Sequence, residues 1–229
     1  MSTWLRNNEA AAAAALTAVL LTAAFGLIFF WVPEDADQGI SQKIFYVHVP
    51  AALTAYACFG WAAVKAFVYL WRRDPRSDLE SYVAVHQGVI FGVITLATGS
   101  IWAKVSWGVW WAWGSRQLVL FLVLFLFYAA YFMLRFSVAA GPARANLSAV
   151  YALFGVALIP VSFLAIRLAQ DYVHPVVFNQ HGPQMAWQMF LTFCVSLAGM
   201  LSLAGAFYRV ELAGKRLDAR VGELRALLG

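Results

Sequence analysis

The run LVLFLVLFLFYAAYFMLRFSV, residues 118–138, decides the fold class, because it holds a full membrane thickness of apolar side chains. A helix needs about 20 predominantly apolar residues to cross the hydrocarbon core of a bilayer. The whole chain of 229 residues has the same character, since 63% of its residues are hydrophobic and only 12% are charged. Soluble domains carry about 25% charged residues. The sequence therefore predicts an all-α integral membrane protein.

Five further runs have the length and composition of a membrane-spanning helix. All of them are continuous rather than alternating, which argues against a transmembrane β-barrel. The predicted spans cover residues 10–32, 44–71, 82–105, 118–138, 147–169 and 186–208. We expect residues 1–229 to form one domain, a bundle of six transmembrane helices.

Basic residues predict the orientation of this bundle, because Lys and Arg concentrate in the cytoplasmic loops of membrane proteins. Six spans place both termini on one side, together with the connections between helices two and three and between helices four and five. That side carries twelve of the sixteen Lys and Arg residues. The opposite side carries the other four, which are Lys43, Lys104, Arg116 and Arg167. We therefore expect cytoplasmic termini, and the net charge of +5 reports topology rather than a nucleic-acid partner.

The segment that follows the sixth span predicts an amphipathic tail helix over residues 209–228. Leu217, Val221, Leu224 and Leu228 fall on one stripe of this helix. Two interpretations stay open at this point. The tail extends the sixth helix and packs on its own bundle, or it docks a cytoplasmic partner.

The loop between the third and fourth spans, SWGVWWAWGSRQ at residues 106–117, holds four tryptophans within seven positions. Trp favours places with one apolar and one wet side, so an ordinary aromatic belt is one interpretation. The density of indoles in a single outer loop favours a second interpretation, a site for a flat apolar ligand. If the loop is helical, Trp107, Trp110 and Trp111 share one side, while Trp113 points elsewhere.

Two histidines are expected at the same membrane face as this loop. His48 lies near the outer start of the second span, and His174 lies in the outer loop between the fifth and sixth spans. Two imidazoles beside an aromatic surface suit an axially ligated haem, although a metal ion such as zinc or copper stays open. The cationic candidates for the haem propionates are Lys104, Arg116 and Arg167.

The other two histidines carry weaker expectations. His86 falls in the cytoplasmic half of the third span, where a buried polar residue with a partner on a neighbouring helix is the favoured interpretation. His181 lies in an outer loop rich in Gly and Pro, and its role stays open.

The tryptophan loop resembles the WWD signature of the CcmC family, also called haem exporter protein C, whose members handle haem in cytochrome c maturation. Three other stretches look like the family's motifs around its first outer histidine, its approach to the loop and its second histidine. The four matching segments are WGVWWAWGSR at 107–116, KIFYVHVPAAL at 43–53, LATGSIWAK at 96–104, and IPVSFLAIRL at 159–168 with VHP at 173–175.

The resemblance implies that the chain binds haem at the outer face of a bacterial inner membrane. By resemblance, His48 and His174 are the axial ligands of a b-type haem that is held transiently and without a covalent bond. The family presents its haem to a membrane-anchored periplasmic chaperone, together with ABC transporter subunits and a small membrane subunit. It is an assembly factor rather than an enzyme, although the wider group is loosely called haem lyases. The loop residues that match the signature are Trp107, Gly108, Trp110, Trp111, Trp113 and Arg116.

One departure from the family signature is expected to matter. The family has an aspartate after the last tryptophan, and this chain has Gly114. A carboxylate there can cap the fourth helix, pair with Arg116 or contact the chaperone. Ser115 can take over the capping.

Two other kinds of membrane protein stay open as alternatives. A cytochrome b-like electron-transfer subunit also uses histidines and haem, but it normally pairs its histidines across the membrane interior. A transporter permease places polar groups near the midplane of the membrane, whereas the centres of these spans are almost purely apolar. A scaffold without haem leaves the tryptophans and histidines unexplained.

Overall fold

The computed structural model describes residues 3–36, 38–168, 178–179, 182–183 and 185–228 of the chain. Side chains are described for residues 10–36, 38–164, 182–183 and 185–227. Within these ranges almost all of the chain is helical. The elements are α1 (Thr3–Phe30), the 3-10 helix η1 (Ile40–Ile44), α2 (Phe45–Arg72), α3 (Pro75–Trp107), α4 (Arg116–Ser137), α5 (Pro142–Val156), α6 (Leu158–Leu168), β1 (Phe178–Asn179), β2 (Gly182–Pro183) and α7 (Trp187–Leu228).

Six stretches of the described helices are long and apolar enough to cross a membrane, which confirms the predicted six-helix membrane fold. The fifth stretch is built from α5 and α6, which are separated at Ala157. Pro160 explains the break, because it has no N–H for the carbonyl of Val156 and its ring crowds that carbonyl. The short strands β1 and β2 pair antiparallel, with Phe178 opposite Pro183.

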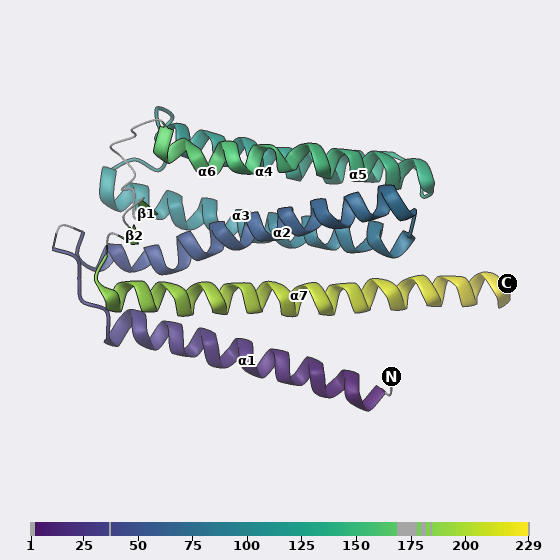
Figure 1. The fold of residues 1–229 in the computed structure, drawn as a ribbon, viewed down its shortest axis with the longest axis horizontal. Coiled ribbons are helices and arrows are strands. Elements are labelled where there is room, and N and C mark those ends of the chain that lie inside the picture. The colour runs from purple at the N-terminus through teal and green to yellow at the C-terminus, as the bar shows by residue number, and fades with distance from the viewer. Residues whose placement is uncertain (1–2, 37, 169–177, 180–181, 184, 229) are drawn as a thin grey trace.

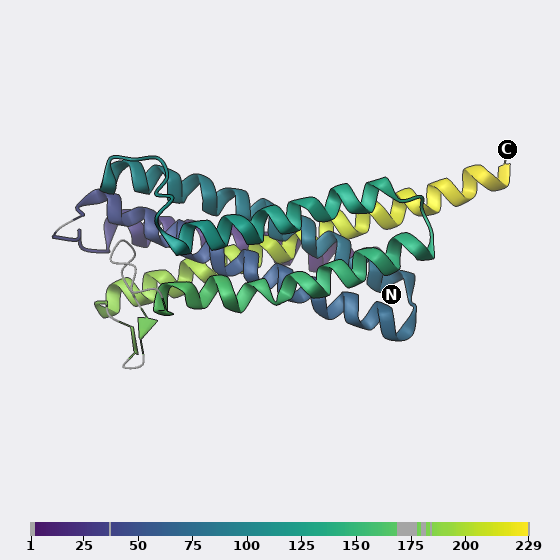
Figure 2. The same cartoon turned by 90° about the horizontal axis from the view of Figure 1, so that it is seen from above.

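The antiparallel helices α2 and α3 lie at the centre of the bundle (Figure 1). Helices α4, α5 and α6 cover one side of this pair, while α7 and then α1 lie on the other side. Both termini lie at one end of the bundle, with the α2–α3 and α4–α5 turns (Figures 1 and 2). We call this the terminal end. The opposite end, which we call the loop end, gathers η1 and the connection from α3 to α4.

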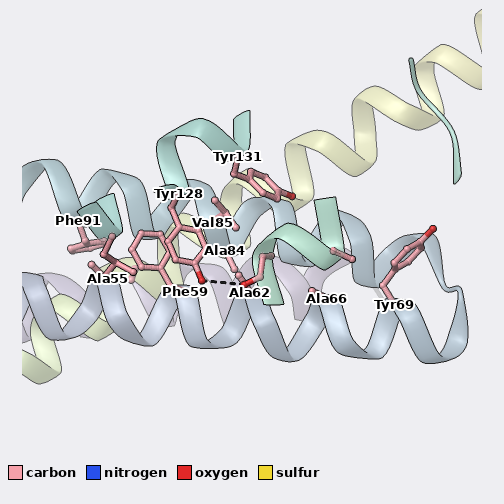
Figure 3. Packing of buried hydrophobic residues seen from close by; sticks show 14 of the residues in the cluster. Ala55, Phe59, Ala62, Ala66, Tyr69, Ala84, Val85, Phe91, Tyr128 and Tyr131 are labelled. Carbon is pink, nitrogen blue, oxygen red and sulfur yellow. Dashed lines mark hydrogen bonds between the residues drawn. The ribbon is translucent and has the colours of Figure 1, made fainter. Parts of the chain in front are cut away.

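Small residues allow α2 and α3 to approach each other closely. Within a bilayer, Gly and Ala at helix interfaces let backbones pack at short range. The buried face of α2 is a series of alanines that includes Ala55, Ala62 and Ala66 (Figure 3). Across from it, a Cβ on Gly88 would lie 2.4 Å from the ring of Phe59. That ring is itself stacked on Tyr128 of α4, with centroids 3.8 Å apart, so α2, α3 and α4 share one tightly packed core.

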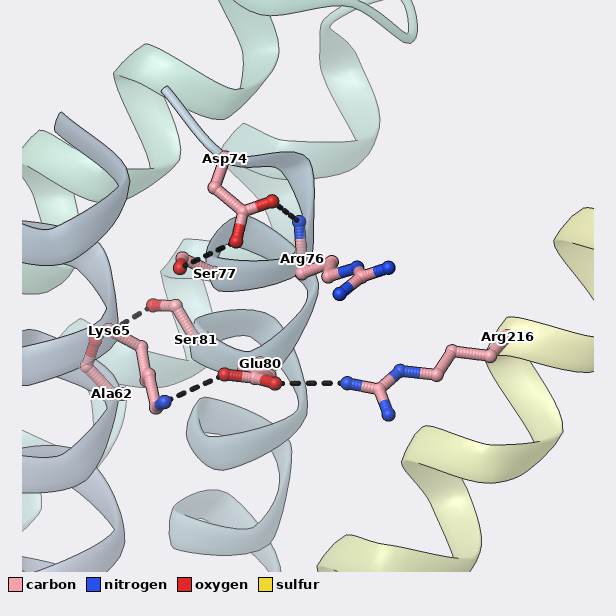
Figure 4. A network of polar contacts seen from close by, with 8 residues as sticks. All are labelled: Ala62, Lys65, Asp74, Arg76, Ser77, Glu80, Ser81 and Arg216. Carbon is pink, nitrogen blue, oxygen red and sulfur yellow. Dashed lines mark hydrogen bonds and ion pairs between the residues drawn. The ribbon is translucent and has the colours of Figure 1, made fainter. Parts of the chain in front are cut away.

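Charged residues at the terminal end are paired between helices. Arg135 of α4 donates two hydrogen bonds, of 2.8 and 2.7 Å, to the carboxylate of Asp78 on α3. Nearby, Glu80 bridges Lys65 of α2 at 2.8 Å and Arg216 of α7 at 2.9 Å (Figure 4). A buried ion pair offsets its desolvation cost only with good geometry and satisfied partners, and the bidentate Arg135 pair has that geometry.

The predicted tail helix is a direct continuation of α7, which runs for 42 residues. Its apolar stripe is not packed on the bundle, because Leu217 and Leu224 are 62% and 58% exposed. Among the described residues, Arg216 is the last of the tail with an ion pair to another helix, and the apolar stripe beyond it is exposed rather than packed on the bundle. The side chain of Leu228 lies outside the described residues.

Gly88→Ala tests the close approach of α2 and α3. We expect a loss of about 1–3 kcal/mol of stability, because the new methyl group overpacks the buried ring of Phe59. Gly60→Ala is the matched control, since a Cβ at Gly60 meets nothing within 4 Å. Alanine is the better helix former by about 1 kcal/mol, so this control is neutral or stabilising. Thermal unfolding in detergent measures both, and a Gly88→Ala variant that melts with the control contradicts the packing.

Candidate functional site

His48 lies in the first turn of α2 and turns its ring toward α3. Its Nδ1 atom is 3.1 Å from the hydroxyl of Thr98. The ring of His48 also packs against Gly99, the residue after Thr98, because a Cβ on Gly99 would lie 2.7 Å from its Cε1 atom. A side chain larger than hydrogen at position 99 therefore has no room unless the imidazole moves. The contact with α3 fixes the histidine from two adjacent positions.

The tryptophan loop begins where α3 ends, at Trp107. Gly108 follows in the left-handed conformation with φ 75°, and its N–H donates to the carbonyl of Lys104 at 3.1 Å. This is a common way to end a helix, and it suits glycine because other residues resist positive φ. The ammonium group of Lys104 donates in turn to the carbonyl of Gly108 at 2.8 Å. The loop after Gly108 is not helical. The shared side expected for Trp107, Trp110 and Trp111 required a helical loop, so that expectation does not apply.

The loop folds back along α3 instead of leading away from it. The hydroxyl of Ser100 donates a hydrogen bond of 2.7 Å to the carbonyl of Trp110. Ser100 precedes the end of α3 by two turns, so the loop returns about 10 Å along the helix axis. Ser100 directly follows Thr98 and Gly99, which hold His48. The histidine and the tryptophan loop are therefore held at the same level of α3 by three consecutive residues.

The four indoles of the loop divide into exposed and supporting ones. Trp110 and Trp113 are 60% and 73% exposed. Trp107 packs edge-on against Trp102 with ring centroids 4.9 Å apart, and Trp111 packs against Trp113 at 5.9 Å. The N–H of Trp111 is buried and has no hydrogen-bond partner among the described residues. A buried donor without an acceptor is costly, so this indole is a strained point of the loop.

Two of the predicted cations lie beside the loop within the described residues. Lys104 bonds the backbone of Gly108, and Arg116 is exposed at the first position of α4. Ser115 is the N-cap residue of α4, but its side chain makes no capping hydrogen bond. Gly114 has open space where a Cβ would stand, so a larger residue fits there without strain.

Several predicted site residues lie outside the part of the chain that the structure describes. His174 and His181 are among them, so the second axial position stays a prediction. Arg167 belongs to α6, but its side chain is outside the described set.

His86 has the expected partner on a neighbouring helix, but its side chain is 43% exposed rather than buried. Its Nδ1 atom is 2.8 Å from the carboxylate of Glu211 on α7, and Gln87 donates to the same carboxylate at 2.7 Å. His86 precedes Thr98 by twelve residues, which is about 18 Å along α3. The two histidines with described side chains therefore lie far apart. They do not form the pair across the membrane interior that a cytochrome b-like subunit uses.

The supporting roles of Thr98, Gly99 and Ser100 could not be assigned from the sequence. The stretch LATGSIWAK was noted for its resemblance, but a helix interior gives no sign of which turn faces another helix. Gln38 was also missed, although its amide oxygen accepts a 3.3 Å hydrogen bond from the indole N–H of Trp102. The run Thr98-Gly99-Ser100 is a cluster of small residues in an apolar span, but this cluster alone does not indicate which helix it faces.

The fold and the site define a multi-pass membrane protein that presents a histidine and an aromatic loop at one end of its helix bundle. The chain belongs to the family described as "Heme exporter protein C", because the family model matches residues 2–225. Proteins of this family are involved in the delivery of haem for cytochrome c maturation.

Individual relatives agree with the family match over most of the chain. Heme exporter protein C of Paracoccus denitrificans is 34% identical over 206 residues, which covers 89% of this chain and 84% of the relative. The protein of the same name from Rhodobacter capsulatus is 32% identical and covers 89% and 87%. A putative cytochrome c biosynthesis ccmC-like mitochondrial protein of Marchantia polymorpha is 28% identical and covers 83% and 81%.

Proposed function

We propose that this protein binds haem as its cargo at the loop end of the bundle and passes it to a periplasmic chaperone during cytochrome c maturation. The observation that carries the proposal is the joint anchoring of His48 and the tryptophan loop on residues 98–100 of α3. A ligand for iron and a set of exposed indoles are thereby held within one turn of the same helix. The family match supports haem as the cargo.

The residues at the loop end fit the chemistry of haem. An imidazole is the common axial ligand of haem iron, and His48 offers one from a packed helix. The exposed indoles of Trp110 and Trp113 offer apolar faces to a porphyrin, which is flat and mostly apolar. Arg116 and Lys104 lie beside the loop, where cations suit carboxylate groups. We assign His174 as the second axial ligand.

The charge bias along the chain supports an outward-facing site. Twelve of the sixteen Lys and Arg residues belong to the terminal end, and cytoplasmic loops are the basic ones. We therefore place the terminal end in the cytoplasm and the loop end at the periplasmic face of the inner membrane. There the exposed loop is accessible to a membrane-anchored chaperone. ABC transporter subunits and a small membrane subunit are the further proposed partners.

The haem is proposed to be bound transiently, as a b-type haem without a covalent bond. Transfer then requires only that ligands be exchanged, and covalent attachment takes place on the chaperone. The protein acts as an assembly factor in this account, since it holds and orients haem while another chain supplies the bond. The family is named for export rather than for a catalysed reaction.

An absorption spectrum tests this function directly. The protein is purified in detergent from haem-replete cells beside His48→Ala, His174→Ala and His86→Ala. We expect a Soret band in the wild type that weakens or shifts in the first two variants, because each removes a proposed axial ligand. His86→Ala is the control, since His86 pairs with Glu211 toward the terminal end.

Two outcomes of the same spectra would contradict the proposal. A folded wild type without a Soret band after haem is added contradicts haem binding by this chain. A band that survives intact in His48→Ala contradicts the assigned ligand.

Gly114→Asp tests the departure from the family signature. The open space at Gly114 predicts an unchanged fold, with stability within about 0.5 kcal/mol of the wild type. Because the new carboxylate lies next to Arg116 and just before α4, we expect it to change haem transfer to the chaperone rather than stability. Thermal unfolding and a transfer assay are compared with Gly114→Asn as the uncharged control. Equal transfer by the wild type and both variants contradicts a role for charge at this position.

A further inference from the structure

The hydroxyl of Thr98 is committed as a donor to the backbone of its own helix. Its Oγ1 atom lies 2.7 Å from the carbonyl oxygen of Ile94 and 3.2 Å from that of Thr95. Carbonyl oxygens only accept hydrogen bonds, so the single hydroxyl proton of Thr98 points at them. Threonine in a helix commonly bonds the preceding turn in this way.

This commitment decides the direction of the hydrogen bond to the histidine. Since Thr98 has no second proton, its oxygen can only accept from the Nδ1 atom of His48, 3.1 Å away. A neutral imidazole carries one proton, so protonation at Nδ1 leaves the lone pair at Nε2. The network thus selects one of the two neutral tautomers.

Gly99 fixes the position of the His48 ring against α3, in addition to the tautomer that Thr98 selects. A Cβ there would lie 2.7 Å from Cε1 and 3.3 Å from Nδ1 of His48, but 3.7 Å from Nε2. Cε1 is therefore the ring atom nearest to Gly99, and Nδ1 lies closer to this position than Nε2 does.

We propose that Thr98 and Gly99 are positioning residues that hold His48 in the Nδ1-protonated tautomer, so that Nε2 provides the lone pair for haem iron. The purpose of this arrangement rests on the proposed function, whereas the tautomer itself is a property of the haem-free protein. Histidines that bind metals commonly donate their other N–H to a neighbouring acceptor, which orients the ring and raises its basicity. Here the acceptor is a threonine whose own proton is occupied.

Nitrogen NMR of the haem-free protein with isotope-labelled histidine tests the tautomer. The signals of His48 are assigned by their loss in His48→Gln. We expect a protonated Nδ1 and an unprotonated Nε2 in the wild type and in Thr98→Ser, with a shift toward Nε2 protonation in Thr98→Val. Thr95→Val is the matched control, because Thr95 bonds the carbonyl of Phe91 in the same way, whereas the hydroxyl that contacts the His48 ring is that of Thr98.

Haem titration of the same variants tests whether the positioning of His48 serves haem binding. We expect Thr98→Val to weaken haem binding by about 10- to 100-fold, the usual loss when such a partner of a metal ligand is removed. Thr98→Ser and Thr95→Val are expected to bind like the wild type. Gly99→Ala is expected to weaken binding as well, because it displaces the ring.

The two measurements separate the possible failures. A wild type with Nε2 protonated, or a Thr98→Val variant with an unchanged tautomer and unchanged affinity, overturns the positioning role while haem binding stands. A wild type that keeps the expected tautomer but binds no haem overturns the proposed function and, with it, the purpose assigned to Thr98.

Discussion

The close approach of α2 and α3 is the constraint on which the rest of the structure depends. Glycines on α3 remove the side chains that would hold the helices apart, at Gly88 against Phe59 and at Gly99 against His48. The first contact builds the core in the membrane interior, and the second seats the histidine at the loop end. One packing rule therefore produces both the bundle and its site. The hydrogen bond between His48 and Thr98 then depends on this spacing.

The two ends of the bundle use their polar groups differently. At the terminal end, carboxylates join helices, as Asp78 does through its ion pair with Arg135 and Glu211 does through its hydrogen bond with His86. These pairs tie α3 to α4 and α7. At the loop end, exposed indoles and cations lie beside a histidine whose ring is fixed by α3. The ion pairs at the terminal end suit a supporting role, and the exposed indoles of Trp110 and Trp113 at the loop end suit a ligand.

Hydropathy was sufficient to predict the six helices, because each run had to satisfy its backbone hydrogen bonds within the bilayer. The break at Ala157 was not predicted, because the fifth span was expected to run unbroken over residues 147–169, although Pro160 supplies a local reason for it. The shape of the tryptophan loop was not predicted either, since it depends on the conformation of Gly108 and on a hydrogen bond from Ser100. The site was harder still. His48 and Thr98 are fifty residues apart in sequence, and only the packing of two helices shows that they touch.

A structure of the haem-loaded protein in a lipid disc tests the central claim most directly, because it locates the iron and the porphyrin relative to α3. The account predicts that iron is bonded to Nε2 of His48, that Nδ1 still faces Thr98, and that the porphyrin lies against Trp110 and Trp113. Iron bound without His48, or a porphyrin on the lipid-facing side away from the loop, would contradict the account.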